Sequence, residues 1–177
     1  MKTLERSAIY SSPPEVVFPY LDDLGVTGMH MTQSSMMMMG SKLNLEYLTE
    51  HHKGLGTRYR WTGKMMGMKM DFTVEVTKWL PGEEKIWETL GTPELLIYSW
   101  YKMHLRLKGV ANGTVALLSF SYGKPEGKFY RLLSFLFGGW YGRWCLKHML
   151  EDCRKLLEEK EVANTFKNSQ SEFTSFK

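Results

Sequence analysis

The chain has 177 residues and a mass of 20.6 kDa, with 43% apolar and 24% charged residues. This length favours a single domain, and the composition excludes a fully disordered or collagen-like chain. The net charge of +4 is mild, and the Lys and Arg residues form no dense run or nucleic-acid-binding motif, so no nucleic-acid partner is expected. The 13 Met residues and the 14% aromatic residues are unusual, and they suit either a Met-rich core or a surface that receives an apolar ligand.

The two cysteines, Cys145 and Cys153, are expected to be reduced and buried. They lie eight residues apart in one predicted helix, about 12 Å along its axis, which is too far for a disulfide. Together with His148 they do not converge on one point of the helix surface, so neither a metal site nor a cofactor is expected. Residues 1–10 hold no signal-peptide core, and no uncharged apolar run reaches membrane-spanning length, so a cytoplasmic protein is expected.

The first elements in chain order are a strand and a short helix. Residues 3–10 alternate weakly, and Ser12 is expected to cap a helix over 13–23, with Glu15 completing a capping box. The buried stripe of this helix is predicted to be Val16, Val17, Tyr20 and Leu21. Residues 25–41 show no clear periodicity and contain Met29, Met31 and the Met run 36–39.

From residue 42 the hydrophobic period changes to two, which predicts a series of β-strands. The strands are expected at 42–48, 58–64, 68–77, 86–90, 101–108 and 114–122. Asn112-Gly113 predicts a hairpin turn before the last strand. The two faces of this strand are similarly apolar, so the sequence does not decide which of them points inward. With the first strand this makes an α+β domain, in which a helix covers the apolar face of an antiparallel sheet.

A long C-terminal helix is predicted over 142–157, where apolar residues recur at spacings of three and four. The apolar residues around its start, including Phe137, Trp140 and Trp144, are out of phase with this stripe. One interpretation is that the chain bends at Gly138-Gly139, so that the earlier residues form a flap over the core. The other is a continuous helix with an exposed aromatic patch for a membrane surface or a protein partner. Residues 161–177 are predicted to be a polar, disordered tail after a domain of residues 1–160.

Three segments carry a resemblance to a known family. They are the opening strand and helix start around Pro13-Pro14-Glu15, the glycine-led strand at 54–61 and the terminal helix at 144–157. Over residues 3–160 the chain resembles the START/Bet v1-like superfamily, also called SRPBCC or polyketide cyclase/dehydrase. The resemblance implies a helix-grip fold: a curved seven-stranded antiparallel sheet wrapped around a long C-terminal helix, with two short helices after the first strand. It also implies an apolar cavity between sheet and helix, in which members bind sterols, phospholipids, quinones, plant hormones or polyketides.

Alternation along the strands selects the inward-facing side chains that are candidates for this cavity. They are Tyr59, Trp61, Met70, Phe72, Val74, Tyr101, Met103 and, on the helix, Met149. The alternative that these side chains simply fill the space stays open. Because the family places its short helices at the cavity entrance, the segment from Met29 to Met39 is interpreted as a pliable gate.

No catalytic constellation emerges from the sequence. His104 alternates with Lys102 and Arg106 and is therefore expected on the outer face, while Ser99 and Ser119 are candidates for the cavity without an acidic or His partner. The sequence favours a non-catalytic protein that binds or transports a hydrophobic small molecule or lipid. The alternatives are an interaction module, either a chaperone cofactor or a membrane-surface protein, and a cyclase/dehydrase-like enzyme.

Overall fold

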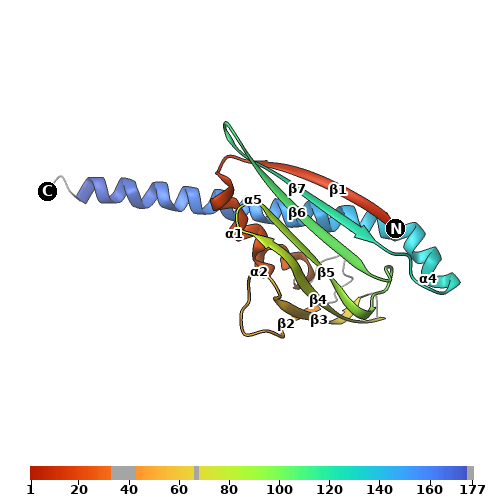
Figure 1. Ribbon diagram of the computed structural model, residues 1–177. Coiled ribbons are helices and arrows are strands. Elements are labelled where there is room, and N and C mark those ends of the chain that lie inside the picture. The colour runs from red at the N-terminus through yellow and green to blue at the C-terminus, as the bar shows by residue number, and fades with distance from the viewer. Residues whose placement is uncertain (33–42, 66–67, 175–177) are drawn as a thin grey trace.

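The computed structural model describes residues 1–32, 43–65 and 68–174 (Figure 1). A curved antiparallel sheet holds a long C-terminal helix and three short helical segments, so the predicted helix-grip fold is confirmed. The elements are β1 (Lys2–Tyr10), α1 (Pro14–Asp22), α2 (Leu24–Thr27), α3 (Met29–Thr32), β2 (Leu43–Tyr47), β3 (Arg58–Met65), β4 (Met68–Leu80), β5 (Glu84–Glu94), β6 (Tyr101–Val110), β7 (Gly113–Tyr122), α4 (Lys128–Leu133), the π-helical turn η2 (Ser134–Gly138) and α5 (Gly139–Thr174).

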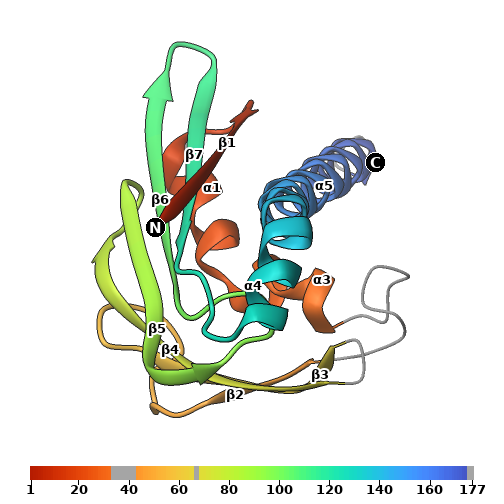
Figure 2. The same cartoon turned by 90° about the vertical axis from the view of Figure 1, so that its right-hand side faces the viewer.

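The seven strands form one sheet in the order β1-β7-β6-β5-β4-β3-β2. Strands β2 to β7 follow one another as a meander, and β1 pairs with β7 along its whole length, from Lys2 opposite Tyr122 to Tyr10 opposite Thr114. Figure 2 shows how the sheet curves around the short helices and α5. The concave face of the sheet is therefore the face that the helices cover.

Two irregularities in the pairing of β4 with β5 help to bend the sheet. The register shifts between Asp71 and Thr73 and again between Val76 and Lys78. A bulge of this kind increases the local twist and bends the strand. The second shift also moves the inward face of β4 from even to odd numbers, so that Trp79 pairs with the buried Lys85.

The first helix begins one residue later than the capping box predicts. Pro13 occupies the N-cap position of α1 without a side-chain cap, and the backbone carbonyl of Ser12 accepts a hydrogen bond from Thr114 Oγ1 at 2.8 Å. The predicted buried stripe is wrong at one position, because Val16 is 45% exposed while Val17, Phe18 and Leu21 are buried. Phe18, which the predicted stripe omits, takes an inward position beside Val17 and Leu21.

The C-terminal helical region is continuous across Gly138-Gly139, because α4, η2 and α5 follow one another without a break. The wider turn of η2 explains the change of phase that the sequence shows, since a π-turn places an extra residue in the helix and rotates what precedes it. The interpretation of residues 129–140 as a flap over the core is wrong. None of the residues of α4 is buried, and Phe137 and Trp140 are exposed.

The tail differs from its prediction as well. α5 extends for 36 residues to Thr174, past the edge of the sheet (Figure 1), where the sequence predicts disorder from residue 161. This stretch contains no Gly or Pro to end a helix. Residues 175–177 lie outside the described part of the chain.

The core lies between the concave face of the sheet and α5. From the helix it receives Leu146, Met149, Leu150, Cys153 and Leu157, and from β7 it receives Ala116, Leu118, Phe120 and Tyr122. The even-numbered face of β7 is therefore the inward one. Tyr10 Oη donates to the backbone carbonyl of Leu150 at 2.9 Å, which ties β1 to the helix. Both cysteines are free, but only Cys153 is buried as expected, whereas Cys145 is half-buried.

Candidate functional site

A cavity of about 90 Å³ lies between the sheet, the short helices and α5. One buried water needs only about 10–15 Å³ on the same measure, and well-packed cores hold few voids larger than a water molecule. The cavity is therefore more than a packing defect. Its rim includes Met31, Leu95, Tyr141 and Cys145, which line the cavity and are only half-buried.

Seven of the eight predicted cavity residues line this space. They are Tyr59, Trp61, Met70, Phe72, Tyr101, Met103 and Met149. Val74 is the exception: it is fully buried, as its alternation predicts, but it belongs to the packed core and does not reach the cavity. The structure thus brings together residues from β3, β4, β6 and α5. Their role in binding a ligand stays a prediction.

Several cavity residues are missed by sequence reasoning. Trp87 on β5 and Phe120 on β7 line the cavity, as do Leu96 to Tyr98 in the connection before β6. The strand containing Trp87 is predicted only as 86–90, and both faces of β7 read as apolar, so alternation cannot select either residue. The tertiary register reveals them, because Trp87 pairs with Val76 and Phe120 pairs with Met103 on the inward face.

One wall of the cavity depends on a glycine. Gly28 follows α2 and lines the cavity directly beneath Trp61. A Cβ atom at this position would lie 2.7 Å from Trp61 Cη2 and 2.6 Å from the backbone oxygen of Leu24. Only a residue without a side chain lets the indole pack this closely against the helix.

The described residues that line the cavity carry uncharged polar groups and no general base. Burial raises the pKa values of Tyr59, Tyr98, Tyr101 and Tyr141 above their ordinary value, and it raises the pKa of the Cys145 thiol to about 12. All five groups therefore stay protonated at neutral pH. Among the described residues that line the cavity there is no carboxylate and no imidazole.

The candidate polar residues from the sequence lie elsewhere. His104 is on the outer face of β6, as predicted, with its Nε2 2.7 Å from Glu84 Oε1. Ser119 also lies on the outer face, where its hydroxyl donates to Glu5 Oε1 at 2.8 Å, so its candidacy for the cavity is wrong. Ser99 is half-buried and is not part of the cavity lining.

A buried ion pair behind the cavity is also missed by sequence reasoning. Lys85 Nζ on β5 lies 2.6 Å from Asp22 Oδ1 at the end of α1 and donates a second hydrogen bond to the Asp22 carbonyl at 2.9 Å. Trp79 Nε1 donates to Asp22 Oδ2 at 3.2 Å. Burial lowers the pKa of Lys85, while the Asp22 carboxylate opposes this shift. The pair fixes the end of α1 against the sheet, two residues before the cavity residue Leu24.

The predicted gate and patch residues divide into two groups. Met31 lines the cavity and Met29 is half-buried in α3, whereas residues 33–39 lie outside the described residues. Trp144 is half-buried and stacks on Tyr141, with 5.7 Å between the ring centroids. Phe137 and Trp140 are exposed and do not line the cavity.

Two further kinds of site are absent from the described part of the chain. No group of three or more His, Cys, Asp or Glu side chains there is placed to hold a metal ion. No helix in the same residues is long and apolar enough to cross a bilayer.

Comparison with known proteins supports the fold but identifies no reaction or ligand. No family model and no curated protein matches the sequence. Among solved structures, a protein from Thermus thermophilus is 18% identical, with a TM-score of 0.65 over 87% of this chain and 95% of its own. The Zhui aromatase/cyclase of Streptomyces sp. R1128 is 13% identical, with a TM-score of 0.62 over 88% of this chain and 95% of its own. Ara h 8.0201 is 12% identical, with a TM-score of 0.56 over 86% of this chain and 97% of its own. The chain therefore has the same helix-grip fold as these proteins.

Proposed function

We propose that this protein binds a hydrophobic small molecule or lipid in the cavity between the sheet and α5. The observation that carries the proposal is the space of about 90 Å³ between the sheet and the helices, lined mainly by aromatic, Met and aliphatic side chains. An apolar ligand that enters such a space leaves water and gains dispersion contacts with the ring faces. The structural likeness to an aromatase/cyclase and to Ara h 8.0201 supports a ligand cavity at this place in the fold.

The groups in the cavity favour a ligand without a buried charge. The tyrosine hydroxyls and the Cys145 thiol are neutral, so a carboxylate or ammonium group placed among them would lose its hydration without a counter-ion. The four lining methionines, Met31, Met70, Met103 and Met149, can change rotamer at low cost and so adapt the cavity to ligands of different shape. A polar end of the ligand would reach the hydroxyls of Tyr101 or Tyr141.

The chemistry of a cyclase or dehydrase has little support in this cavity. General acid–base catalysis needs a group that exchanges protons near neutral pH. The titratable lining groups among the described residues are tyrosines and one thiol, all held protonated. We therefore propose a carrier or sensor, acting in the cytoplasm, in preference to an enzyme.

The experiment is binding of the neutral fluorescent probe N-phenyl-1-naphthylamine, with native mass spectrometry of protein purified from its own host. Met149→Trp adds bulk to the cavity from α5 and is expected to weaken probe binding by about tenfold or more. Leu156→Trp is the matched control on the same helix, because Leu156 is half-buried away from the cavity.

Equal affinities of the Met149→Trp and Leu156→Trp variants for the probe would place binding outside the cavity. No probe binding by the unmodified protein, together with no co-purifying small molecule, would refute the proposal. Thermal unfolding of each variant checks that the fold is kept.

A further inference from the structure

The helical region before α5 exposes an unusual number of large apolar side chains. We use the name apolar tip for six of them: Phe129, Leu132, Phe135, Leu136, Phe137 and Trp140. Their exposed fractions lie between 42% for Phe137 and 74% for Phe135. Single exposed apolar residues are ordinary, but a contiguous group marks a surface that meets something else.

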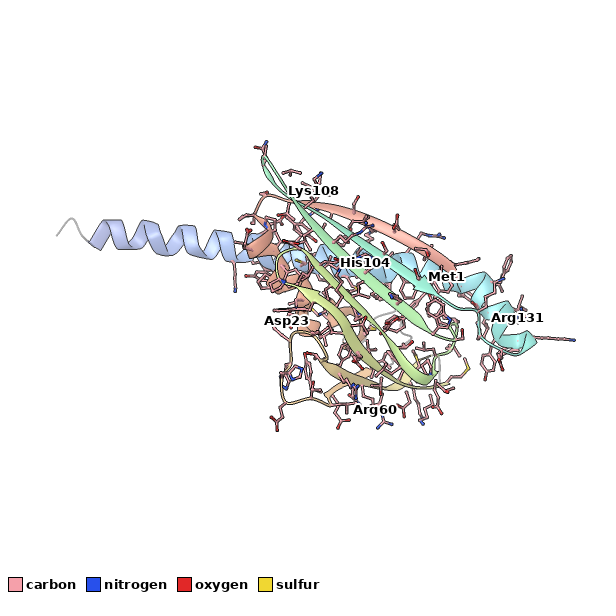
Figure 3. The ribbon with its side chains drawn as sticks, in the orientation of Figure 1. Met1, Asp23, Arg60, His104, Lys108 and Arg131 are labelled. Atoms are coloured by element: carbon pink, nitrogen blue, oxygen red, sulfur yellow. The ribbon has the colours of Figure 1, made fainter. Side chains whose placement is uncertain are left out.

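The apolar tip lies at one end of the molecule. Figure 1 shows α4 projecting beyond the sheet at the end opposite the C-terminus, and Figure 3 shows the side chain of Arg131 pointing away from the body of the protein. From Phe129 to Trp140 the helix rises only about 16 Å. The hydrocarbon core of a bilayer is about 30 Å thick, so this segment can lie in a membrane interface but cannot cross it.

The charges around the tip are almost all positive. Between residues 124 and 143 the chain carries Lys124, Lys128, Arg131 and Arg143 against the single carboxylate of Glu126. All four cations are exposed, and within the described residues none of them forms an ion pair. Lys2 adds a further positive charge, with its Nζ 6.0 Å from the centre of the Phe135 ring.

We infer that the apolar tip seats the protein on an anionic membrane surface. Phe and Trp side chains settle at the boundary of headgroups and acyl chains, and neighbouring Lys and Arg side chains pair with anionic headgroups at the same depth. A projecting convex tip fits a flat, deformable surface, and the near absence of carboxylates disfavours an equally basic second copy of this chain. This inference concerns a surface apart from the cavity and does not depend on what the cavity binds.

The test is co-sedimentation with vesicles of phosphatidylcholine alone and of an equal mixture of phosphatidylcholine and phosphatidylglycerol. The unmodified protein is expected to bind the mixed vesicles, with an affinity that falls as salt is added. Phe135→Ser/Trp140→Ser is expected to lower that affinity by about tenfold or more. Lys128→Glu/Arg131→Glu is expected to remove the preference for anionic vesicles.

The matched control is Ile9→Ser/Leu55→Ser, which removes two apolar side chains that are 66% and 65% exposed elsewhere on the surface. It is expected to bind the mixed vesicles like the unmodified protein. Circular dichroism and thermal unfolding check that every variant is folded. An equal loss of binding in the control, no binding by the unmodified protein, or a dimer that Phe135→Ser/Trp140→Ser dissociates would overturn the inference.

Discussion

The Lys85–Asp22 pair shows how much one buried residue can depend on another. Both side chains are almost fully buried, and each satisfies the charge of the other at 2.6 Å. Removing one partner of such a pair leaves a charge in a site from which water is excluded, which costs more than the pair itself contributes. The sequence does not reveal this pair, because Lys85 and Asp22 are 63 residues apart and the bulge near Val76 changes which side chains of β4 face inward.

We expect Asp22→Asn to lower the free energy of unfolding by about 3–5 kcal/mol at neutral pH, because Lys85 is left charged without a counter-ion. Asp22→Leu/Lys85→Met is expected to recover much of this loss. In folded Asp22→Asn, Lys85 holds its proton less tightly than it does in the unfolded chain. The free energy of unfolding of Asp22→Asn therefore rises with pH relative to that of the unmodified protein.

Urea unfolding of Asp22→Asn and of the unmodified protein at several pH values between neutral and about pH 9 measures the difference between their free energies of unfolding. If the difference in the free energy of unfolding stays constant or widens as pH rises, Lys85 is not charged and unpaired in Asp22→Asn.

At the scale of elements, η2 explains why two amphipathic patterns in one helical region do not align. The π-turn lies where the sequence changes phase, and it brings the carbonyl of Gly138 2.6 Å from Tyr98 Oη, which donates a hydrogen bond to it. Periodicity detects the change of phase but cannot distinguish a bend from a π-turn, because both rotate the apolar face. The packing of Tyr98 against this turn comes from a segment 40 residues away.

Two neighbouring tyrosines provide a matched test of the hydrogen bond between Tyr98 and Gly138. Tyr98→Phe is expected to destabilise the protein by about 1–2 kcal/mol, because the Gly138 carbonyl loses its buried donor. Tyr122→Phe is expected to be neutral or slightly stabilising, because the buried Tyr122 hydroxyl has no hydrogen-bond partner among the described residues. Chemical denaturation of the two variants measures the difference, and equal losses of stability would show that the hydrogen bond to η2 contributes nothing.

At the scale of the whole molecule, the positions along the chain of the strands and of the long helix could be predicted, because alternation and turn residues are local properties of the chain. Six of the seven strand residues selected by alternation reach the cavity for the same reason. The cavity itself depends on how completely helices and sheet fill the space between them, which no local pattern records. The extent of α5 also escapes prediction, since a polar sequence without Gly or Pro is compatible with both helix and disorder.

The buried thiol and tyrosine groups, which keep their protons in the folded protein, predict a loss of stability at alkaline pH. Burial raises the pKa values of Cys145 and Cys153 from 9.0 to about 12, so the folded protein keeps protons that the unfolded chain releases above about pH 9. The free energy of unfolding therefore falls as pH rises, by about 1.4 kcal/mol per pH unit for each thiol at the steepest. The buried tyrosines add to this fall above about pH 10.

Urea unfolding at about pH 8 and about pH 10 measures the slope, with Cys145→Ala/Cys153→Ala as the comparison. The variant is expected to show a shallower slope, whatever its stability at neutral pH. An unchanged slope would mean that the thiols do not contribute to the alkaline loss of stability.

The hydrogen bond from Tyr98 to Gly138 joins two regions that otherwise have separate chemistry. Tyr98 is part of the cavity wall, and Gly138 ends the turn that carries Phe135 to Phe137. If seating the helix on a bilayer shifts η2, it also shifts a side chain that a bound ligand touches. Thermodynamic reciprocity then requires that a ligand change the affinity for the bilayer by the same factor by which the bilayer changes the affinity for the ligand. Loading and release of the ligand would then be coupled to arrival at and departure from the membrane.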